Sequence, residues 1–144
     1  MSRLHLHIAV DDLHHNIDFY SVLFGVTPTV VKADYAKWQL EDPKANFAIS
    51  SRGGKPGLDH AGIQADSADE LAAIEARLRE ANLPGEAQTG TTCCYAKSDK
   101  YWTMDPQGMA WEGFHTLGEA ALFSESAPTE SGSVCCAPKL SSCC

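Results

Sequence analysis

The segment HLHIAVDDL, residues 5–13, has the pattern of a strand that leads into a helix. Apolar side chains alternate with His5, His7 and other small or polar residues, and this period of two predicts a strand with one apolar face. Asp12 is a favourable cap for the segment that follows, in which apolar side chains recur at helical spacing until Gly25 provides a stop. These residues predict one strand and then one helix.

The same order of elements begins again at LDHAGIQAD, residues 58–66, about 55 residues further along the chain. Ser67 and Glu70 form a capping box for a second helix, which we expect to end between Asn82 and Gly85. The segments YAKWQLE and NFAISS follow the first helix, KYWTM and MAWEGF follow the second, and each is expected to be a strand. Two similar halves indicate an internal duplication.

The bulk properties describe one soluble globular domain. The chain has 144 residues, 44% of them hydrophobic and 21% charged, with a net charge of -8. This charge argues against a nucleic-acid partner or an anionic membrane surface. The N-terminus has no signal-peptide pattern, and no apolar run reaches the roughly 20 residues of a membrane span. We therefore expect a cytoplasmic protein with reduced thiols.

The domain is expected to cover residues 1–116, with a first module at about 1–52 and a second at about 58–116. Residues 117–144 are rich in Ser, Pro, Gly and Glu, and they are expected to form a flexible tail. A chain shortened to Gly118 is then expected to fold.

Three residues lie at corresponding places in the duplicated halves and are candidate metal ligands. His5 and His60 are on the first strand of each half, and Glu112 is on the last strand. Two imidazoles and one carboxylate suit non-haem Fe(II) working with O2, although Zn, Ni and Mn accept the same ligand types. His7 shares a strand face with His5, and spacing alone leaves both open as ligands. The other histidines are not expected to bind the metal: His14, His15 and His115.

All six cysteines occur as adjacent pairs: Cys93-Cys94, Cys135-Cys136 and Cys143-Cys144. Adjacent cysteines cross-link a chain poorly, because a bridge between neighbours is strained and closes almost no loop. Two neighbouring thiolates can instead chelate a soft centre such as trivalent arsenic. The first pair is expected on a loop at the mouth of the metal cleft. Lys97 and Lys100 either lower the pKa values of its thiols or are simply solvated. The two later pairs either capture As(III) or are incidental residues of the tail.

The segments HLHIAVDDL, LDHAGIQAD and DPQGMAWEGF together resemble the vicinal oxygen chelate superfamily of glyoxalases, bleomycin-resistance proteins and extradiol dioxygenases. The resemblance implies an α+β fold in which two βαβββ modules form a metal-containing cleft. It selects His5 over His7, because the family's histidine lies seven residues before the Asp that precedes the helix, and it adds His60 and Glu112. Glyoxalases commonly take a fourth ligand from the last strand of the first half. NFAISS offers none, which favours oxygenase chemistry over isomerisation.

The segment TTCCYAKSDKYW, taken with the Cys-paired tail, is similar to the organoarsenical carbon–arsenic lyases, also called trivalent organoarsenical cleaving enzymes. This resemblance implies an Fe(II)-dependent dioxygenase that uses O2 to cleave the carbon–arsenic bond of methylarsenite and trivalent aromatic arsenicals. Arsenite is released, which gives organoarsenical resistance. In this reading His5, His60 and Glu112 hold the iron, and Cys93 and Cys94 hold the arsenic.

Other functions stay open at this point. The related cadmium-induced proteins have a similar CCYA segment, so a non-catalytic arsenic- or cadmium-binding protein is one alternative. A glyoxalase, a ring-cleaving dioxygenase and an antibiotic-sequestering protein are others. The partner is expected to be a small molecule, with no nucleic acid and no membrane. The protein is expected to be a monomer or a homodimer, and its modules pair within one chain or swap between two.

Overall fold

The computed structural model of the chain describes residues 1–124. They form two helices and eight strands, whose order repeats as expected. The first half contains β1 (Arg3–Ala9), α1 (Leu13–Phe24), β2 (Val30–Lys32), β3 (Tyr35–Glu41) and β4 (Lys44–Ser50). The second half contains β5 (Gly57–Ala65), α2 (Ala68–Glu80), β6 (Gly85–Cys93), β7 (Ala96–Met104) and β8 (Ala110–Glu119). Each half is a βαβββ module, as the resemblance implied.

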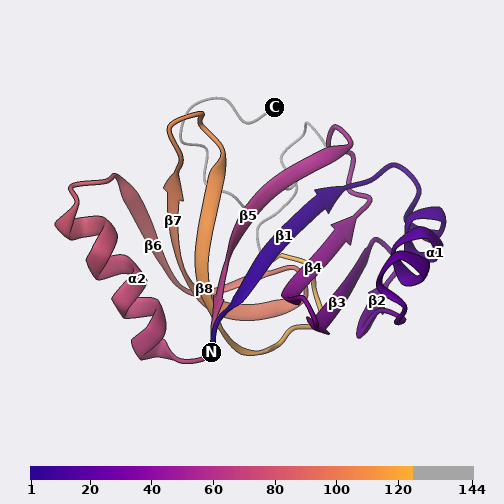
Figure 1. Cartoon of the computed structure of the whole chain (residues 1–144), viewed down its shortest axis with the longest axis horizontal. Coiled ribbons are helices and arrows are strands. Elements are labelled where there is room, and N and C mark those ends of the chain that lie inside the picture. Colours follow the sequence, from indigo (N-terminus) through magenta and orange to yellow (C-terminus); the bar gives the residue numbers. More distant parts are fainter. Residues whose placement is uncertain (125–144) are drawn as a thin grey trace.

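All eight strands join one curled sheet in the order β2-β3-β4-β1-β5-β8-β7-β6. Within each module the first and last strands pair in parallel, β1 with β4 and β5 with β8. The two modules meet where β1 pairs antiparallel with β5. In Figure 1, α1 and α2 lie on opposite outer sides of the sheet. The modules are thus related by a pseudo-twofold axis between β1 and β5, and they pair within one chain.

The helix caps follow the sequence signals with one difference. Asp12 accepts a hydrogen bond from the His15 backbone N–H, and Gly25 ends α1 in the left-handed conformation at φ 70°. At α2, the Ser67 side chain accepts from the Glu70 backbone N–H. The Glu70 carboxylate accepts from the backbone N–H of Asp66 rather than that of Ser67, so the second half of the expected capping box is displaced by one residue.

The two faces of the sheet have different chemistry because side chains alternate along each strand. The outer face of the first module packs on α1 through an apolar cluster that includes Trp38, Phe47 and Ile49. The concave face carries buried polar side chains: His5, His7, Asn46, Ser50, His60, Ser98, Lys100 and Glu112. The polar face of β1 is therefore more deeply buried than its apolar face, since the sheet curls around it.

The ordered fold continues beyond residue 116, the boundary expected from the sequence. β8 extends to Glu119, and Phe123 is buried against the aromatic rings of Tyr35 and Tyr95. Ser124 forms a β-bridge with Cys93. An aromatic anchor therefore holds a segment whose composition resembles that of a tail. The cysteines of the last two pairs lie outside the described residues.

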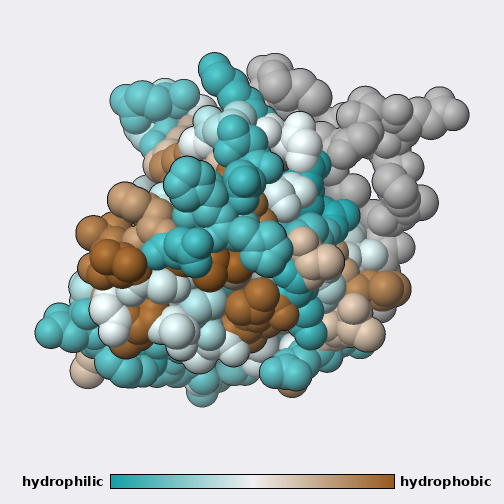
Figure 2. Space-filling view, turned by 90° about the vertical axis from the view of Figure 1, so that its right-hand side faces the viewer, coloured by the Kyte–Doolittle hydropathy of each residue, from teal (hydrophilic) through white to brown (hydrophobic). Residues whose placement is uncertain are grey.

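The side of the molecule formed by α1 carries separate apolar patches among hydrophilic side chains (Figure 2). Phe19, Val22 and Leu23 of α1 are exposed. Neither described helix is long and apolar enough to cross a membrane. Whether the protein is a monomer or a homodimer stays a prediction.

Candidate metal centre and thiol pair

Three side chains from three strands converge on the concave face. His5 comes from β1, His60 from β5 and Glu112 from β8. The Nε2 atoms of the two imidazoles are 3.3 Å apart. Oε1 of Glu112 is 3.4 Å from Nε2 of His5 and 3.3 Å from Nε2 of His60. The three predicted ligand atoms therefore form a nearly equilateral triangle.

A hydrogen-bond partner orients each imidazole. Nδ1 of His5 lies 3.0 Å from the carbonyl oxygen of Asn46, and Nδ1 of His60 lies 2.6 Å from the Asp59 carboxylate. Because these oxygens only accept, Nδ1 donates in both rings. Nε2 of each ring then points to the triangle and presents a lone pair there whenever it carries no proton, which is how metal-binding histidines are usually supported.

Glu112 lies in a strongly charged environment. Its Oε2 accepts a hydrogen bond from Lys100 Nζ at 2.9 Å, and both side chains are about 95% buried. Burial by itself would raise the pKa of Glu112, but Lys100 and His60 hold it well below its usual value. Burial by itself would lower the pKa of His60, but the carboxylates of Glu112 and Asp59 raise it to about 9. Glu112 is therefore a carboxylate with one oxygen paired and the other facing the imidazoles.

Gly62 gives Glu112 the room that it needs. Gly62 pairs with Glu112 across β5 and β8. A Cβ atom at Gly62 would lie 2.3 Å from the Glu112 carbonyl oxygen and 2.8 Å from its Cγ. Real Cβ atoms do not make such contacts, so any larger residue would displace Glu112.

His7 lies beside this triangle, on the face that the sequence predicted. Its Nε2 is 2.8 Å from Ser50 Oγ. His5, His7 and His60 form a buried group whose ligand atoms all lie within 4.8 Å of one another and could hold a metal ion. Burial lowers the pKa of His5 to about 4 and that of His7 to about 3, so both imidazoles are neutral and able to bind a metal at neutral pH.

The remaining histidines lie away from this group. His14 and His15 are exposed on α1. Nδ1 of His115 is 3.2 Å from the carbonyl oxygen of Ala65, on the neighbouring strand. That none of the three binds a metal stays a prediction.

The donor set fits a divalent metal ion. Nitrogen and carboxylate ligands lie about 2.0–2.2 Å from such an ion, so three ligands at tetrahedral or octahedral angles are about 3.0–3.4 Å from one another. The edges of the triangle, 3.3, 3.3 and 3.4 Å, agree with this spacing. The geometry accepts one small divalent ion, and it does not select among metals.

The vicinal thiols lie on the same side of the sheet, close to the imidazoles. Cys93 ends β6 and Cys94 begins the two-residue turn to β7. Cys94 and Tyr95 have φ values of 57° and 60°, which is typical of a tight hairpin turn of type I′. The two sulfurs are 3.1 Å apart, and Cys94 Sγ is 3.9 Å from Nδ1 of His7. The pair thus lies on a hairpin end, where the sequence predicted a loop.

Of the two readings left open for Lys97 and Lys100, a lowered thiol pKa is wrong for Cys94. Burial raises the pKa of Cys94 to about 12, and the opposing effect of Lys100 is the smaller one. Lys100 is occupied by Glu112, and Lys97 is exposed. The lysines therefore do not lower the pKa of Cys94, because the hairpin end is folded over the concave face.

A small inner cavity of about 30 Å³ connects the thiols to the predicted metal ligands. Its walls include His5, Glu112 and Lys100 as well as Cys93 and Cys94. A larger pocket of about 320 Å³ adjoins it and also reaches Cys94. The described chain therefore brings the two predicted functional groups to one cavity.

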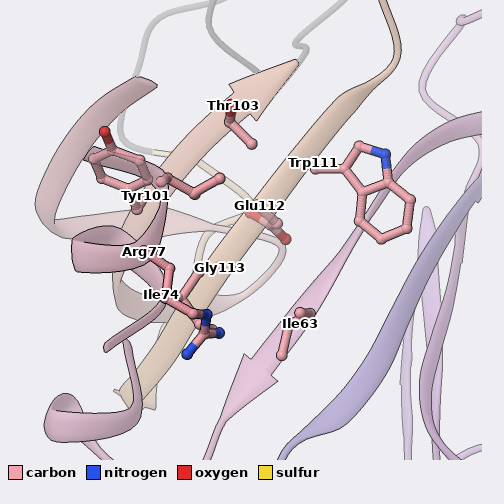
Figure 3. A pocket seen from close by; sticks show the side chains of 9 residues that line it. Ile63, Ile74, Arg77, Tyr101, Thr103, Trp111, Glu112 and Gly113 are labelled. Carbon is pink, nitrogen blue, oxygen red and sulfur yellow. The ribbon is translucent and has the colours of Figure 1, made fainter. Parts of the chain in front are cut away.

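A third pocket, of about 290 Å³, lies on the opposite face of the sheet against α2 (Figure 3). Its lining includes Ile63, Ile74, Tyr101 and Trp111, and it contains no imidazole or thiol. Glu112 lies on this stretch of β8, but its carboxylate contacts the imidazoles on the concave face. Size alone therefore does not identify the site.

The Glyoxalase/Bleomycin resistance protein/Dioxygenase superfamily matches residues 3–112 of the chain. The chain belongs to this superfamily. The Mn(II)-bound glyoxalase from Novosphingobium aromaticivorans has the same fold, with a TM-score of 0.60 and 15% identity over 90% of this chain and 44% of that chain. Homoprotocatechuate 2,3-dioxygenase from Arthrobacter globiformis gives a TM-score of 0.60 and 19% identity over 84% and 38%.

Among curated proteins, the chain is similar to two groups. It is 39% identical to the trivalent organoarsenical cleaving enzyme of Bacillus sp. (strain MD1), over 99% of this chain and 94% of that protein. It is 40% identical to the cadmium-induced protein CadI of Mycobacterium tuberculosis, over 85% of this chain and 82% of that protein. The chain is thus an oxygen-chelate-fold protein related to both groups.

The sheet register identifies the position where a fourth ligand would come from the first module. Glu112 pairs with Gly62, two residues after His60. The corresponding residue two positions after His5 is His7, which pairs with Ala48 of β4. Ala48 has no ligand atom. This alanine therefore stands where a glyoxalase-type fourth ligand would come from, which explains why the segment NFAISS offers none.

Sequence reasoning missed the supporting residues Asn46, Asp59 and Gly62. Asp59 precedes His60 directly, which was a usable signal. The contacts of the other two residues depend on strand register, which spacing along one chain does not reveal.

Proposed function

We propose that this protein uses Fe(II) and O2 to cleave the carbon–arsenic bond of trivalent organoarsenicals such as methylarsenite, and releases arsenite. For methylarsenite the reaction balances as CH3As(OH)2 + O2 → As(OH)3 + HCHO, so that one oxygen atom goes to arsenic and the other to the methyl carbon. The observation that carries the proposal is the inner cavity, because His5 and Glu112 share it with Cys93 and Cys94. Relatives named as trivalent organoarsenical cleaving enzymes support it. In a cell this activity gives resistance to organoarsenicals.

In this proposal His5, His60 and Glu112 hold the iron and His7 does not. The choice rests on Glu112, whose Oε1 is close to Nε2 of both His5 and His60. Nε2 of His7 is instead 2.8 Å from Ser50 Oγ. Two histidines and one carboxylate would leave open positions on a bound ion, and Fe(II) held by these residues would supply O2 activation.

The thiols bind and position the substrate. In the reduced protein, methylarsenite reacts with the thiols of Cys93 and Cys94: two S–As bonds form, two As–OH bonds break, and each thiol proton leaves with hydroxide as water. The arsenic is then fixed at a cavity that also contains the metal ligands. Fixing both reactants in one place converts an encounter into a positioned reaction, which is a large source of rate enhancement.

Lys100 and the imidazole partners keep the ligands ready. Lys100 holds Oε2 of Glu112, which leaves Oε1 for the metal. Asp59 and Asn46 hold the Nδ1 atoms of His60 and His5. These contacts fix ligand orientation before any ion or substrate arrives.

The proposal separates metal binding from arsenic binding, and two variants test this. Replacing Cys94 by Ser should leave iron content near one ion per chain and weaken methylarsenite binding at least tenfold, since a hard oxygen replaces a soft sulfur. Replacing His5 by Ala should remove the iron and leave methylarsenite binding unchanged. His7→Ala is the matched control and should keep its iron. Iron analysis and anaerobic titration with methylarsenite, in phosphine-reduced protein, give both quantities.

Wild-type methylarsenite binding in both Cys93→Ser and Cys94→Ser would contradict the thiol assignment. Equal loss of iron in His5→Ala and His7→Ala would contradict the choice of His5 over His7.

A second candidate is a protein that binds arsenic or cadmium without turnover, as the similarity to cadmium-induced proteins allows. Such a binding protein requires the thiols, but it has no use for the triangle of ligand atoms from His5, His60 and Glu112. Release of arsenite from methylarsenite separates the two functions.

A further inference from the structure

The pocket of about 290 Å³ between α2 and the sheet has no role in the function described so far (Figure 3). Its lining residues come from α2 and from the strands β5, β7 and β8. The carboxylate of Glu112 lies on the other face of the sheet, beside the imidazoles. This pocket is therefore separate from both the metal ligands and the thiols.

The duplication of the fold explains why this pocket exists. Equivalent positions of the two modules can be counted along the paired strands from His5 and His60. The residue of β8 that corresponds to Ile49 of β4 is then Gly113. Ile49 is buried in the cluster that joins the first module to α1, whereas Gly113 has no side chain. The second module therefore has open space where the first has a core residue.

A second exchange enlarges this space. Trp38 of β3 packs on the aromatic rings of α1, but its counterpart on β7 is Thr103. Protein interiors are normally close-packed, because the side chains around a void lose contacts on one side. A space of ligand size at two core positions therefore indicates a site for an occupant.

The side chains around the pocket are mostly apolar and are only half-buried: Ile63, Ile74, Leu78 and Trp111. An apolar group that covered them would remove their surface from water, which is favourable. A pocket of about 290 Å³ is at the lower end of small-molecule sites. It therefore suits one ring with a short substituent.

Arg77 gives this pocket a positive charge. Arg77 lines it from α2 (Figure 3) and forms no ion pair within the part of the chain that the structure describes. Arg79, two residues further along α2, is instead paired with Glu75. The acidic residue of the lining is Glu112, whose carboxylate is paired with Lys100 on the other face. An anionic group is therefore attracted to the pocket.

We propose that this pocket binds a small aromatic carboxylate, with its ring between α2 and β8 and its carboxylate paired with Arg77. The ring takes the space that Trp38 and Ile49 fill in the first module. The planar guanidinium of Arg77 can donate two parallel hydrogen bonds to a carboxylate. The inference is independent of the arsenic chemistry, because neither the thiols nor the metal ligands hold this molecule.

The test uses phenylacetate as the probe and phenylacetamide as its uncharged match, which has the same ring. Binding is titrated by tryptophan fluorescence in the full-length protein. Trp111 lines the pocket and is half-buried, whereas Trp38 and Trp102 are fully buried, so the bound ring contacts Trp111. The measured quantity is the affinity ratio of the carboxylate to the amide.

Wild-type protein should bind phenylacetate with a Kd of about 1 mM and prefer it to the amide about two- to fivefold, the usual size of an exposed ion pair. Arg77→Gln should bring the ratio to one, and Arg77→Lys should keep part of the preference. Arg79→Gln removes the same charge from the same helix outside the pocket and is the matched control. Thr103→Phe places a ring where Trp38 lies in the first module, and it should weaken both compounds at least tenfold.

No saturable response to phenylacetate in wild-type protein, or equal effects of Arg77→Gln and Arg79→Gln on the ratio, would overturn the inference. A Trp111 signal that follows protein concentration rather than phenylacetate would assign the pocket to a second copy of the chain, and would overturn it as well. Cys94→Ser should bind phenylacetate like the wild type. Loss of binding in that variant would place the probe at the thiols and contradict the inference.

Discussion

At the residue scale, the site depends on how Glu112 is constrained. Lys100 pairs with one carboxylate oxygen, and the other lies 3.3–3.4 Å from the two imidazole nitrogens. A buried carboxylate is costly unless it is paired and hydrogen-bonded. Both requirements are met here without closing the side of Glu112 that faces His5 and His60.

Gly62→Ala tests this constraint without removing any ligand. The new methyl group would lie 2.8 Å from Glu112 Cγ, so the carboxylate must shift. We expect divalent-metal affinity to fall at least tenfold, with a loss of about 1–3 kcal/mol in unfolding free energy. Gly54→Ala is the control, because a Cβ there has its nearest contact at 3.6 Å. Metal titration and denaturant unfolding measure both; equal metal affinity in the two variants would contradict the account.

At the element scale, the thiol-bearing hairpin is fixed by contacts from distant segments. The Tyr95 hydroxyl donates to Asp34, Arg52 pairs with the same carboxylate, and the Arg52 guanidinium is 3.8 Å from the centre of the Phe123 ring. The turn that carries Cys94 is therefore held by β-strand connections of the first module and by the segment after β8.

Phe123 is the anchor of that last segment. Phe123→Ala should lower the unfolding free energy by about 3 kcal/mol, because it empties a buried aromatic site. Leu122→Ala, at a residue that is 63% exposed, should cost less than about 0.5 kcal/mol. Chemical denaturation of the full chain compares them. A chain shortened to Gly118 should lose at least as much unfolding free energy as Phe123→Ala. If the wild-type, substituted and shortened chains were equally stable, residues 119–124 would be dispensable, as their composition suggests.

The elements differ in how well the sequence predicts them. The six strands in the interior of the sheet have apolar runs or alternation, and the sequence located all of them. The segments β2 and β6 were not located, and they are the two edges of the sheet. Edge strands have a neighbour on one side only; most of β6 is exposed or half-buried, so selection for an apolar pattern is weak there.

At the scale of the whole molecule, duplication explains both what was predicted and what was not. Equivalent strands place His5 and His60 near the pseudo-twofold axis, which is why a repeat in the sequence indicated these two strands. The repeat left His5 and His7 both open, and the family resemblance chose between them. The places of Ala48 and Gly62 beside the site depend on the register between strands that are far apart in sequence. The sequence alone does not reveal that register. The raised pKa of Cys94 could not be predicted for a similar reason, since burial depends on how the sheet curls.

The central claim is that the metal triangle and the thiol pair act on one substrate. The most direct measurement loads the protein with Fe(II) and methylarsenite without O2, admits O2, and follows arsenic species by chromatography and mass spectrometry. The account predicts arsenite from wild-type protein, and none from Glu112→Gln, from Cys94→Ser or without O2. Methylarsenite that stays bound and unchanged, or arsenite formed equally by Glu112→Gln, would contradict it.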